Sequence, residues 1–224
     1  MTPAQFERQC RAIADCSARL LLPSAWVWTT GSGGAGAGGY LAQSFEWAPL
    51  PTAASVDDGD DVLLSWAGDS VDVSAEAEDE GTLPRDAAAG LVRTELHVVL
   101  SPVYGQPLLL FRLYDATSGA LLPHADACAL LERWLQQRQR PEPDPAPSSP
   151  AAGVGGPAVT QQEHPVLGTP FYALHGCETA GLMATLGHDE GSSSYVLGWL
   201  SLVGPLVGLK LPLELATAVV TEER

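Results

Sequence analysis

The first helix of the chain is predicted from a cap and a periodic apolar face. Thr2 suits an N-cap, Pro3 suits the first helical position, and Gln5 follows the cap by three residues, as in a capping box. Apolar and small residues then recur at helical spacing, at Phe6, Cys10, Ile13, Ser17 and Leu20. This face can lie on a sheet, and we expect Pro23 to end the helix.

Patterns typical of strands dominate the following residues. The predicted strands cover Trp26–Trp28, Tyr40–Trp47, Val62–Trp66, Arg93–Leu100 and Pro107–Tyr114. The glycine-rich run Gly31–Gly39 predicts a loose hairpin loop between the first two strands, and Tyr104–Gln106 predicts a turn between the last two. The glycine run lacks the spacing and the following helix of a phosphate-binding loop, which excludes nucleotide binding there.

Helical spacing returns in the second half of the chain. The predicted helices are Ala125–Arg138, Glu178–Leu186, Ser194–Leu202 and Leu213–Val220. The run Pro141–Pro157 holds six prolines, three glycines and two serines without periodicity, which predicts a flexible insertion. We expect His164–Cys177 to be irregular and extended, because Pro165 disfavours helix at the residue before it. Together the elements predict one α+β domain over residues 1–224, an antiparallel sheet flanked by helices.

Charge and cysteine usage exclude several classes of protein. The net charge is −16, and the segment 57–86 holds eleven acidic residues and one basic residue, which predicts a solvated acidic loop. Nucleic acids and anionic membranes attract basic surfaces, so we expect neither as a partner. No stretch is long and apolar enough to predict integral membrane association, and Met1–Asp15 lacks the pattern of a signal peptide. The four cysteines show no metal-ligand spacing, so we expect no metal or cofactor and reduced thiols in the cytoplasm.

Cys177 is the candidate nucleophile of the chain. It precedes a predicted helix, whose N-terminal N–H groups favour a thiolate. A charged His175 would lower the thiol pKa, and Glu178 would oppose that shift. A Cys–His hydrolase is one interpretation: the chain has no asparagine, which excludes a Cys-His-Asn triad, but a Cys-His-Asp arrangement using His97, His164 or His188 stays open.

Three stretches resemble, in the same order, the autophagocytosis-associated conjugating enzymes. They read HVVLSPVYGQPLLLFR at 97–112, VTQQEHPVLGTPFYALHGCETAGLM at 159–183 and YVLGWLSLVGPLVGLKLP at 195–212. The weaker match of Trp26–Trp28 with Gly39–Leu41 brings the resemblance to about half of the chain. The tail Trp199–Pro205 distinguishes the chain from the sister enzyme that acts on lipid-linked modifiers. The resemblance implies a ubiquitin-conjugating core with extra strands and the Pro-rich insertion.

The resemblance also implies a reaction and its partners. Cys177 would accept a ubiquitin-like modifier, autophagy-related protein twelve, as a thioester from an E1-like activating enzyme. It would then pass the modifier to a lysine of autophagy-related protein five. Both steps form an oxyanion that needs hydrogen-bond donors. Many ubiquitin-conjugating enzymes use an asparagine for this purpose; here the candidates are backbone N–H groups, Tyr104, Thr169 and Thr179, with Tyr104 ranked first.

Two histidines and one departure from the family pattern complete the sequence analysis. His175 either tunes the thiol or orders the segment around it. His164 is expected to be structural, with its ring hydrogen-bonded at the start of the active segment. The family usually has His-Pro-Cys where this chain has His175-Gly176-Cys177, and glycine loosens the backbone there. This departure and the missing asparagine support the remaining alternative, a non-catalytic binding module with the same fold.

Overall fold

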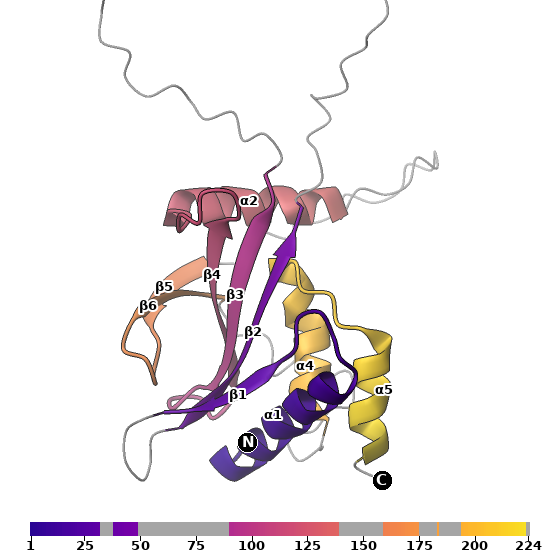
Figure 1. The fold of residues 1–224 in the computed structure, drawn as a ribbon. Helices are drawn as coiled ribbons and strands as arrows, with labels where there is room; N and C mark the ends of the chain where they lie inside the picture. The colour runs from indigo at the N-terminus through magenta and orange to yellow at the C-terminus, as the bar shows by residue number, and fades with distance from the viewer. Residues whose placement is uncertain (32–37, 49–89, 139–158, 175–182, 184–193, 223–224) are drawn as a thin grey trace, which may run out of the picture.

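The computed structural model of the protein describes residues 1–31, 38–48, 90–138, 159–174, 183 and 194–222. Within these residues, six strands form one antiparallel sheet in the order β1-β2-β3-β4-β6-β5, with helices packed against it (Figure 1). The strands are β1 (Val27–Thr30), β2 (Gly39–Trp47), β3 (Val92–Leu100), β4 (Pro107–Asp115), β5 (Val159–Glu163) and β6 (Pro170–Leu174). The helices are α1 (Pro3–Arg19), α2 (His124–Arg138), α4 (Tyr195–Val203), the 3-10 helix η2 (Gly204–Val207) and α5 (Leu213–Glu222). The predicted α+β class is confirmed.

Helix α1 begins where its cap predicts. The Gln5 backbone N–H donates to the Thr2 hydroxyl at 3.2 Å, and the Thr2 N–H donates to the Gln5 side chain at 2.8 Å, so both halves of the capping box are present. The helix packs against β1 and β2, and its buried residues include Phe6, Cys10, Ile13 and Ser17. It ends at Arg19 rather than at Pro23, because Leu21 takes a left-handed φ of 51° before the chain reaches the proline.

The β3–β4 hairpin forms the centre of the sheet. Its register runs from Val92 opposite Asp115 to Leu100 opposite Pro107. Residues 101–106 form the turn, in which the Ser101 N–H donates to the Gln106 carbonyl at 2.8 Å. Gly105 has a φ of 62°, which glycine adopts without steric cost. The predicted hairpin and turn are confirmed.

The two faces of the sheet differ in what covers them. Side chains of even-numbered positions of β3, such as Leu96 and Val98, lie in the main core with α1 and α4. Helices α1, α4 and α5 lie together on one side of the sheet, and α2 crosses one end (Figure 1). On the other face, Tyr40, Val99 and Phe171 belong to a smaller apolar cluster. The pleat of the strands therefore divides their residues between two chemical environments.

A second hairpin corrects one sequence prediction. Residues 164–177 were expected to be irregular, but β6 is a regular strand within that range, and β5, which was not predicted, pairs with it from Val159–Leu174 to Glu163–Pro170. The hairpin extends the sheet beyond β4, through the pairs Leu110–Ala173 and Phe111–Tyr172. The expected extended conformation is correct, whereas the expected irregularity is wrong because β5 and β4 satisfy the hydrogen bonds of β6 on both sides.

Helix α4 and the residues after it close the main core against α2. The Trp134 indole donates to the Pro205 carbonyl at 3.0 Å, and its ring centroid lies 4.9 Å from that of Trp47 at the end of β2. Gly208 has a φ of 84°, and a Cβ there would lie 2.7 Å from the Trp47 ring. Glycine is therefore required at this position for two reasons: the backbone is left-handed, and the Trp47 ring leaves no space for a Cβ.

Some predictions fall outside the described residues. They are the strand Val62–Trp66, the acidic segment 57–86, the insertion 141–157 and the helix Glu178–Leu186. In the ranges that the structure describes, no helix is long and apolar enough to cross a membrane.

Candidate functional site

The predicted nucleophile and two of its supporting residues lie outside the described part of the chain. These are Cys177, His175 and Thr179. Elements on both sides of them are described: β6 ends at Leu174, and α4 begins at Tyr195. The position of these two elements therefore sets the frame in which the active segment begins and ends.

Both elements approach the turn between β3 and β4. β6 runs antiparallel to β4, with Ala173 opposite Leu110, so its C-terminal end points toward the start of β4 and thus toward the turn. At the start of α4, the Tyr195 hydroxyl donates to the Gln106 side chain of that turn at 3.5 Å. The turn 101–106 thus lies at the end of the sheet toward which β6 points and beside the start of α4.

Tyr104 lies on this turn with its side chain 80% exposed. Its backbone N–H donates to the Ser101 hydroxyl at 3.3 Å, which fixes the backbone and leaves the ring outside the core. Thr169, another candidate donor from the sequence, lies at the opposite end of β6, and its hydroxyl accepts a hydrogen bond from Arg112. Tyr104 and Thr169 are therefore not brought together, and only Tyr104 lies at the end where Leu174 stands.

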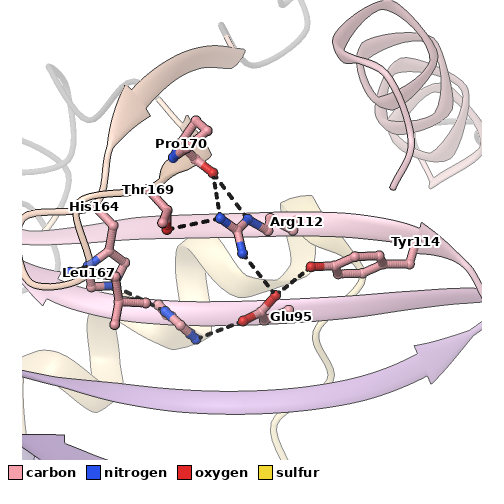
Figure 2. A network of polar contacts seen from close by, with 8 residues as sticks. Glu95, Arg112, Tyr114, His164, Leu167, Thr169 and Pro170 are labelled. Atoms are coloured by element: carbon pink, nitrogen blue, oxygen red, sulfur yellow. Dashed lines mark hydrogen bonds and ion pairs between the residues drawn. The ribbon is translucent and has the colours of Figure 1, made fainter. Parts of the chain in front are cut away.

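The structure assembles a polar network that sequence analysis did not predict, on the face opposite the main core. His97 on β3 and His164 after β5 are 5% and 0% exposed, and their Nδ1 and Nε2 atoms are 3.1 Å apart (Figure 2). The rings pack against two aromatic side chains: His97 stacks on Tyr40 with centroids 4.6 Å apart and lies 4.8 Å from Phe171. Two imidazoles are thus buried in an apolar and aromatic setting.

The hydrogen bonds fix where the protons of this pair lie. The backbone N–H groups of Val166 and Leu167 donate to His164 Nδ1 at 3.1 and 3.2 Å, so Nδ1 is an acceptor and the proton is on Nε2. His164 Nε2 then donates to His97 Nδ1, which leaves the His97 proton on Nε2, 3.4 Å from the Glu95 carboxylate. The expectation that His164 is structural and capped at this turn is confirmed.

Arg112 closes the network back onto the same turn. Its guanidinium donates to the Pro170 carbonyl from two nitrogens, at 3.1 and 2.9 Å, and to the Thr169 hydroxyl at 3.0 Å (Figure 2). It also lies 3.8 Å from Glu95, its cross-strand partner. We call Glu95, His97, Arg112 and His164 the polar ring. The contacts run from His164, at the start of the 164–169 turn, to His97, Glu95 and Arg112, and Arg112 contacts the end of the same turn.

Burial and hydrogen bonding shift two titrations in the polar ring. Burial, with the nearby His97 and Arg112, lowers the pKa of His164 to about 4, which keeps this ring neutral near pH 7. The hydrogen bond from His97 lowers the pKa of Glu95 to about 2, assisted by the Tyr114 hydroxyl at 2.7 Å and by Arg112. Near pH 7 the polar ring therefore holds an ionised Glu95 carboxylate beside the Arg112 guanidinium, together with a neutral His164 imidazole.

This geometry limits what the two histidines can do chemically. All four ring nitrogens of His97 and His164 already contact Glu95, each other or the backbone. Neither histidine is free to act as a general base for a cysteine. The described residues contain no cluster of three or more His, Cys, Asp or Glu that could hold a metal ion.

The other cysteines behave as packing residues. Cys10 and Cys16 are fully buried thiols of α1, and the Arg19 guanidinium donates to the Cys16 sulfur at 3.2 Å. Burial raises the pKa of the Cys10 thiol well above its ordinary value. Cys128 in α2 is free and partly exposed, and its pKa is also raised, mainly by burial and further by Glu132. Neither Cys10 nor Cys128 has the lowered pKa that activates a cysteine.

Comparison with known proteins identifies a family. Residues 5–214 match the family described as "Autophagocytosis associated protein, active-site domain". Similar proteins include the "Ubiquitin-like-conjugating enzyme ATG10" of Homo sapiens, 34% identical over 144 residues, which are 62% of this chain and 59% of that protein. Proteins of the same name in Gibberella zeae and Arabidopsis thaliana are 32% and 29% identical, over 68% and 54% of this chain and 61% and 51% of their own. The sequence match to autophagy-related protein ten, rather than to its sister enzyme, is confirmed.

A solved structure is also similar in part. It is described as "Crystal structure of Autophagic E2, Atg10", with 23% identity, a TM-score of 0.34, and coverage of 53% of this chain and 66% of that one. The chain spans about three-fifths of the length of its human relative. The family assignment rests on the match over residues 5–214.

Proposed function

Because the chain belongs to the autophagocytosis-associated protein family, which it matches through the active-site domain, we propose that it is an E2-like conjugating enzyme of autophagy. The nucleophile is Cys177, which lies within the matched residues 5–214. The relatives with this family's sequence are named ubiquitin-like-conjugating enzymes, and this single observation carries the proposal.

The proposed reaction has two acyl transfers. The Cys177 thiolate attacks the thioester carbonyl of the modifier on an E1-like enzyme; a new C–S bond forms, and the thiolate of that enzyme leaves. A lysine amine of the acceptor then attacks the new thioester, a C–N bond forms, the Cys177 thiolate leaves and the amine loses its proton to solvent. The proposed modifier is autophagy-related protein twelve, the acceptor is autophagy-related protein five, and the site of action is the cytoplasm.

The described residues support a reaction next to the β3–β4 turn. Cys177 follows the end of β6 by three residues, a length of chain that spans at most about 11 Å. β6 points toward the turn that carries Tyr104, whose side chain is exposed. In this proposal the Tyr104 hydroxyl donates to the oxyanion, and His175 and Thr179 assist the cysteine from its own segment.

The alternatives receive less support from the geometry. A Cys–His hydrolase built on His97 or His164 would need a ring nitrogen that the polar ring already uses. A non-catalytic binding module rests on Gly176 and the missing asparagine, and no described contact favours it. It differs from the enzyme in one result, because it predicts that Cys177→Ala leaves function in cells intact.

The test is a charging assay. The protein is mixed with the activating enzyme, the modifier and ATP, and the products are separated on gels with and without reductant. We expect a band heavier by one modifier that reductant removes. Cys177→Ala abolishes this band, and Cys177→Ser converts it into an ester that resists reductant. Cys128→Ser is the matched control, because this partly exposed cysteine lies on α2, and it should charge like the wild type.

Two results would contradict the proposal. An adduct that survives in Cys177→Ala would place the thioester elsewhere. No adduct at all, with partners shown to be active on a known conjugating enzyme, would favour the binding module. Turnover of small esters or peptides without ATP would instead revive the hydrolase.

A further inference from the structure

The β5–β6 hairpin is attached to the rest of the sheet by a short ladder. Within the described strands, β6 pairs with β4 at two positions, whereas β3 and β4 pair along their full length. The backbone ladder to β4 is therefore short, and the apolar packing of Phe171–Leu174 on both faces of the sheet contributes to the position of the hairpin. Yet this hairpin ends at Leu174, from which the chain continues directly to Cys177.

Side chains of the polar ring add polar contacts at both ends of the 164–169 turn, which the apolar packing of β6 does not reach. At the start of the turn, His164 contacts His97 at 3.1 Å. At the end of the turn, Arg112 donates hydrogen bonds to the Pro170 carbonyl and the Thr169 hydroxyl. The turn is itself closed by the His164 N–H, which donates to the Thr169 carbonyl at 2.8 Å. Both ends of the turn are therefore fastened to the central strands β3 and β4.

The geometry points to a role for this fastening beyond stability. We propose that the polar ring of Glu95, His97, Arg112 and His164 is a positioning device, which sets the end of β6 at Leu174, from which the chain continues to Cys177, on the side of the sheet that carries the β3–β4 turn. This inference rests on the proposed function, in which Cys177 carries the thioester. The four side chains act through β6 and do not touch the reacting atoms.

The placement of the polar ring separates positioning from folding. The ring lies on the face of the sheet opposite the main core, where the helices do not pack. Each member donates to or accepts from a specific partner, and a satisfied network of this kind selects one arrangement of the chain. Tyr172 and Leu174 of β6 also pack in the main core, so loosening the polar ring should shift the hairpin rather than detach it, while α1 and α4 stay folded.

Arg112 offers the sharpest variants. Arg112→Lys keeps the positive charge but cannot donate from several nitrogens in a fixed plane, and Arg112→Leu removes charge and donors. Arg93→Leu is the matched control: Arg93 also lies on this face of the sheet, with its guanidinium 4.5 Å from the Tyr114 ring centroid, but its only described contact is with that ring on β4. At saturating charged activating enzyme, we expect the single-turnover rate to fall about 10- to 100-fold in Arg112→Leu, the scale for a misplacement of about 1 Å.

His97 provides a rescue that a purely structural role would not require. His97→Leu leaves His164 Nε2 and Glu95 without their partner. His97→Gln retains a donor and an acceptor on one amide. We expect the charging rate to follow the order wild type, Gln, Leu, with the half-saturating concentration of charged activating enzyme unchanged, because in this proposal the four side chains act through β6.

Hydrogen exchange locates the effect independently of any reaction. In Arg112→Lys and His97→Gln we expect faster amide exchange in peptides covering 159–174 and unchanged exchange in peptides covering α1 and β3. Uniformly faster exchange would overturn the proposal and make the polar ring a general stabiliser. A charging rate that falls no further in Arg112→Leu than in Arg93→Leu would overturn it too. If the wild type does not charge at all, the proposed function fails, while the exchange data still decide whether the polar ring fixes the hairpin.

Discussion

Acid should weaken the fold through His164, and the sign of the effect follows from its surroundings. The His164 imidazole is fully buried. It faces His97 from β3, Arg112 from β4 and Tyr40 from β2, and Glu95 lies beyond His97. Its pKa falls from the ordinary 6.5 to about 4 on folding. Between these values the unfolded chain binds a proton that the folded chain excludes. The contribution is therefore complete above pH 6.5 and is lost as the pH falls toward 4.

The magnitude follows from the shift. Each pKa unit corresponds to about 1.4 kcal/mol, so protonation of His164 should remove up to about 3 kcal/mol of stability between pH 6.5 and pH 4. Glu95 acts in a lower window with the same sign. Its pKa is lowered from 4.5 to about 2, so its contribution is present above pH 4.5 and is lost below that value.

Urea unfolding at several pH values from 7.5 to 4 measures this loss. His164→Asn is the matched variant, because an Asn side-chain oxygen can accept the N–H groups of Val166 and Leu167 but does not titrate. We expect the variant to be less stable at pH 7 and to lose less stability on acidification. His124→Asn, on the surface of α2, should keep the wild-type slope. Equal slopes for the wild type and His164→Asn would refute the reasoning.

Two further predictions concern the end of the main core and the β3–β4 turn. Gly208→Ala should lower the free energy of unfolding, measured in urea, by about 2–4 kcal/mol, because the new Cβ meets the Trp47 ring and the φ is 84°. The control Gly119→Ala has a φ of 70° and open space around the Cβ, and should lose about 1 kcal/mol. Equal losses in the two variants would show that the Trp47 ring moves aside freely. Tyr104→Phe should leave the melting temperature unchanged, because the side chain is 80% exposed, and should slow modifier transfer about 10- to 100-fold if its hydroxyl binds the oxyanion; a full transfer rate would remove Tyr104 from the mechanism.

Local signals in the sequence predict much of the fold. The cap at Thr2, the pairing of the strands on either side of the glycine-rich run and the turn that contains Tyr104–Gln106 depend on residues close together in the chain, and each is found as predicted. β5 escaped prediction because its sequence, VTQQE, is mostly polar and shows no alternation. An edge strand with one neighbour buries little, so the pattern that marks other strands is absent.

The polar ring was predictable only in part. Glu95 and His97 stand two apart on one strand, and the turn places Arg112 directly opposite Glu95, so one face with three polar residues follows from the sequence once the register is known. The contact between His97 and His164 joins residues 67 apart and depends on how the second hairpin folds over the sheet. Cys177 came from resemblance to a family, and it lies outside the described residues.

The pairing of Trp47 with Val92 joins the end of β2 to the start of β3, and the most acidic stretch of the sequence lies between these two residues. These two residues face each other across β2 and β3, so β2 ends beside the start of β3. The segment 57–86, which lies between Trp47 and Val92 in the sequence, has a net charge of −10, out of −16 for the whole chain. For a flexible loop, doubling the length costs only about 0.6 kcal/mol. With a loop of that kind between the paired ends of β2 and β3, the charge of the protein could be changed within one stretch of sequence while the register of the two strands is kept.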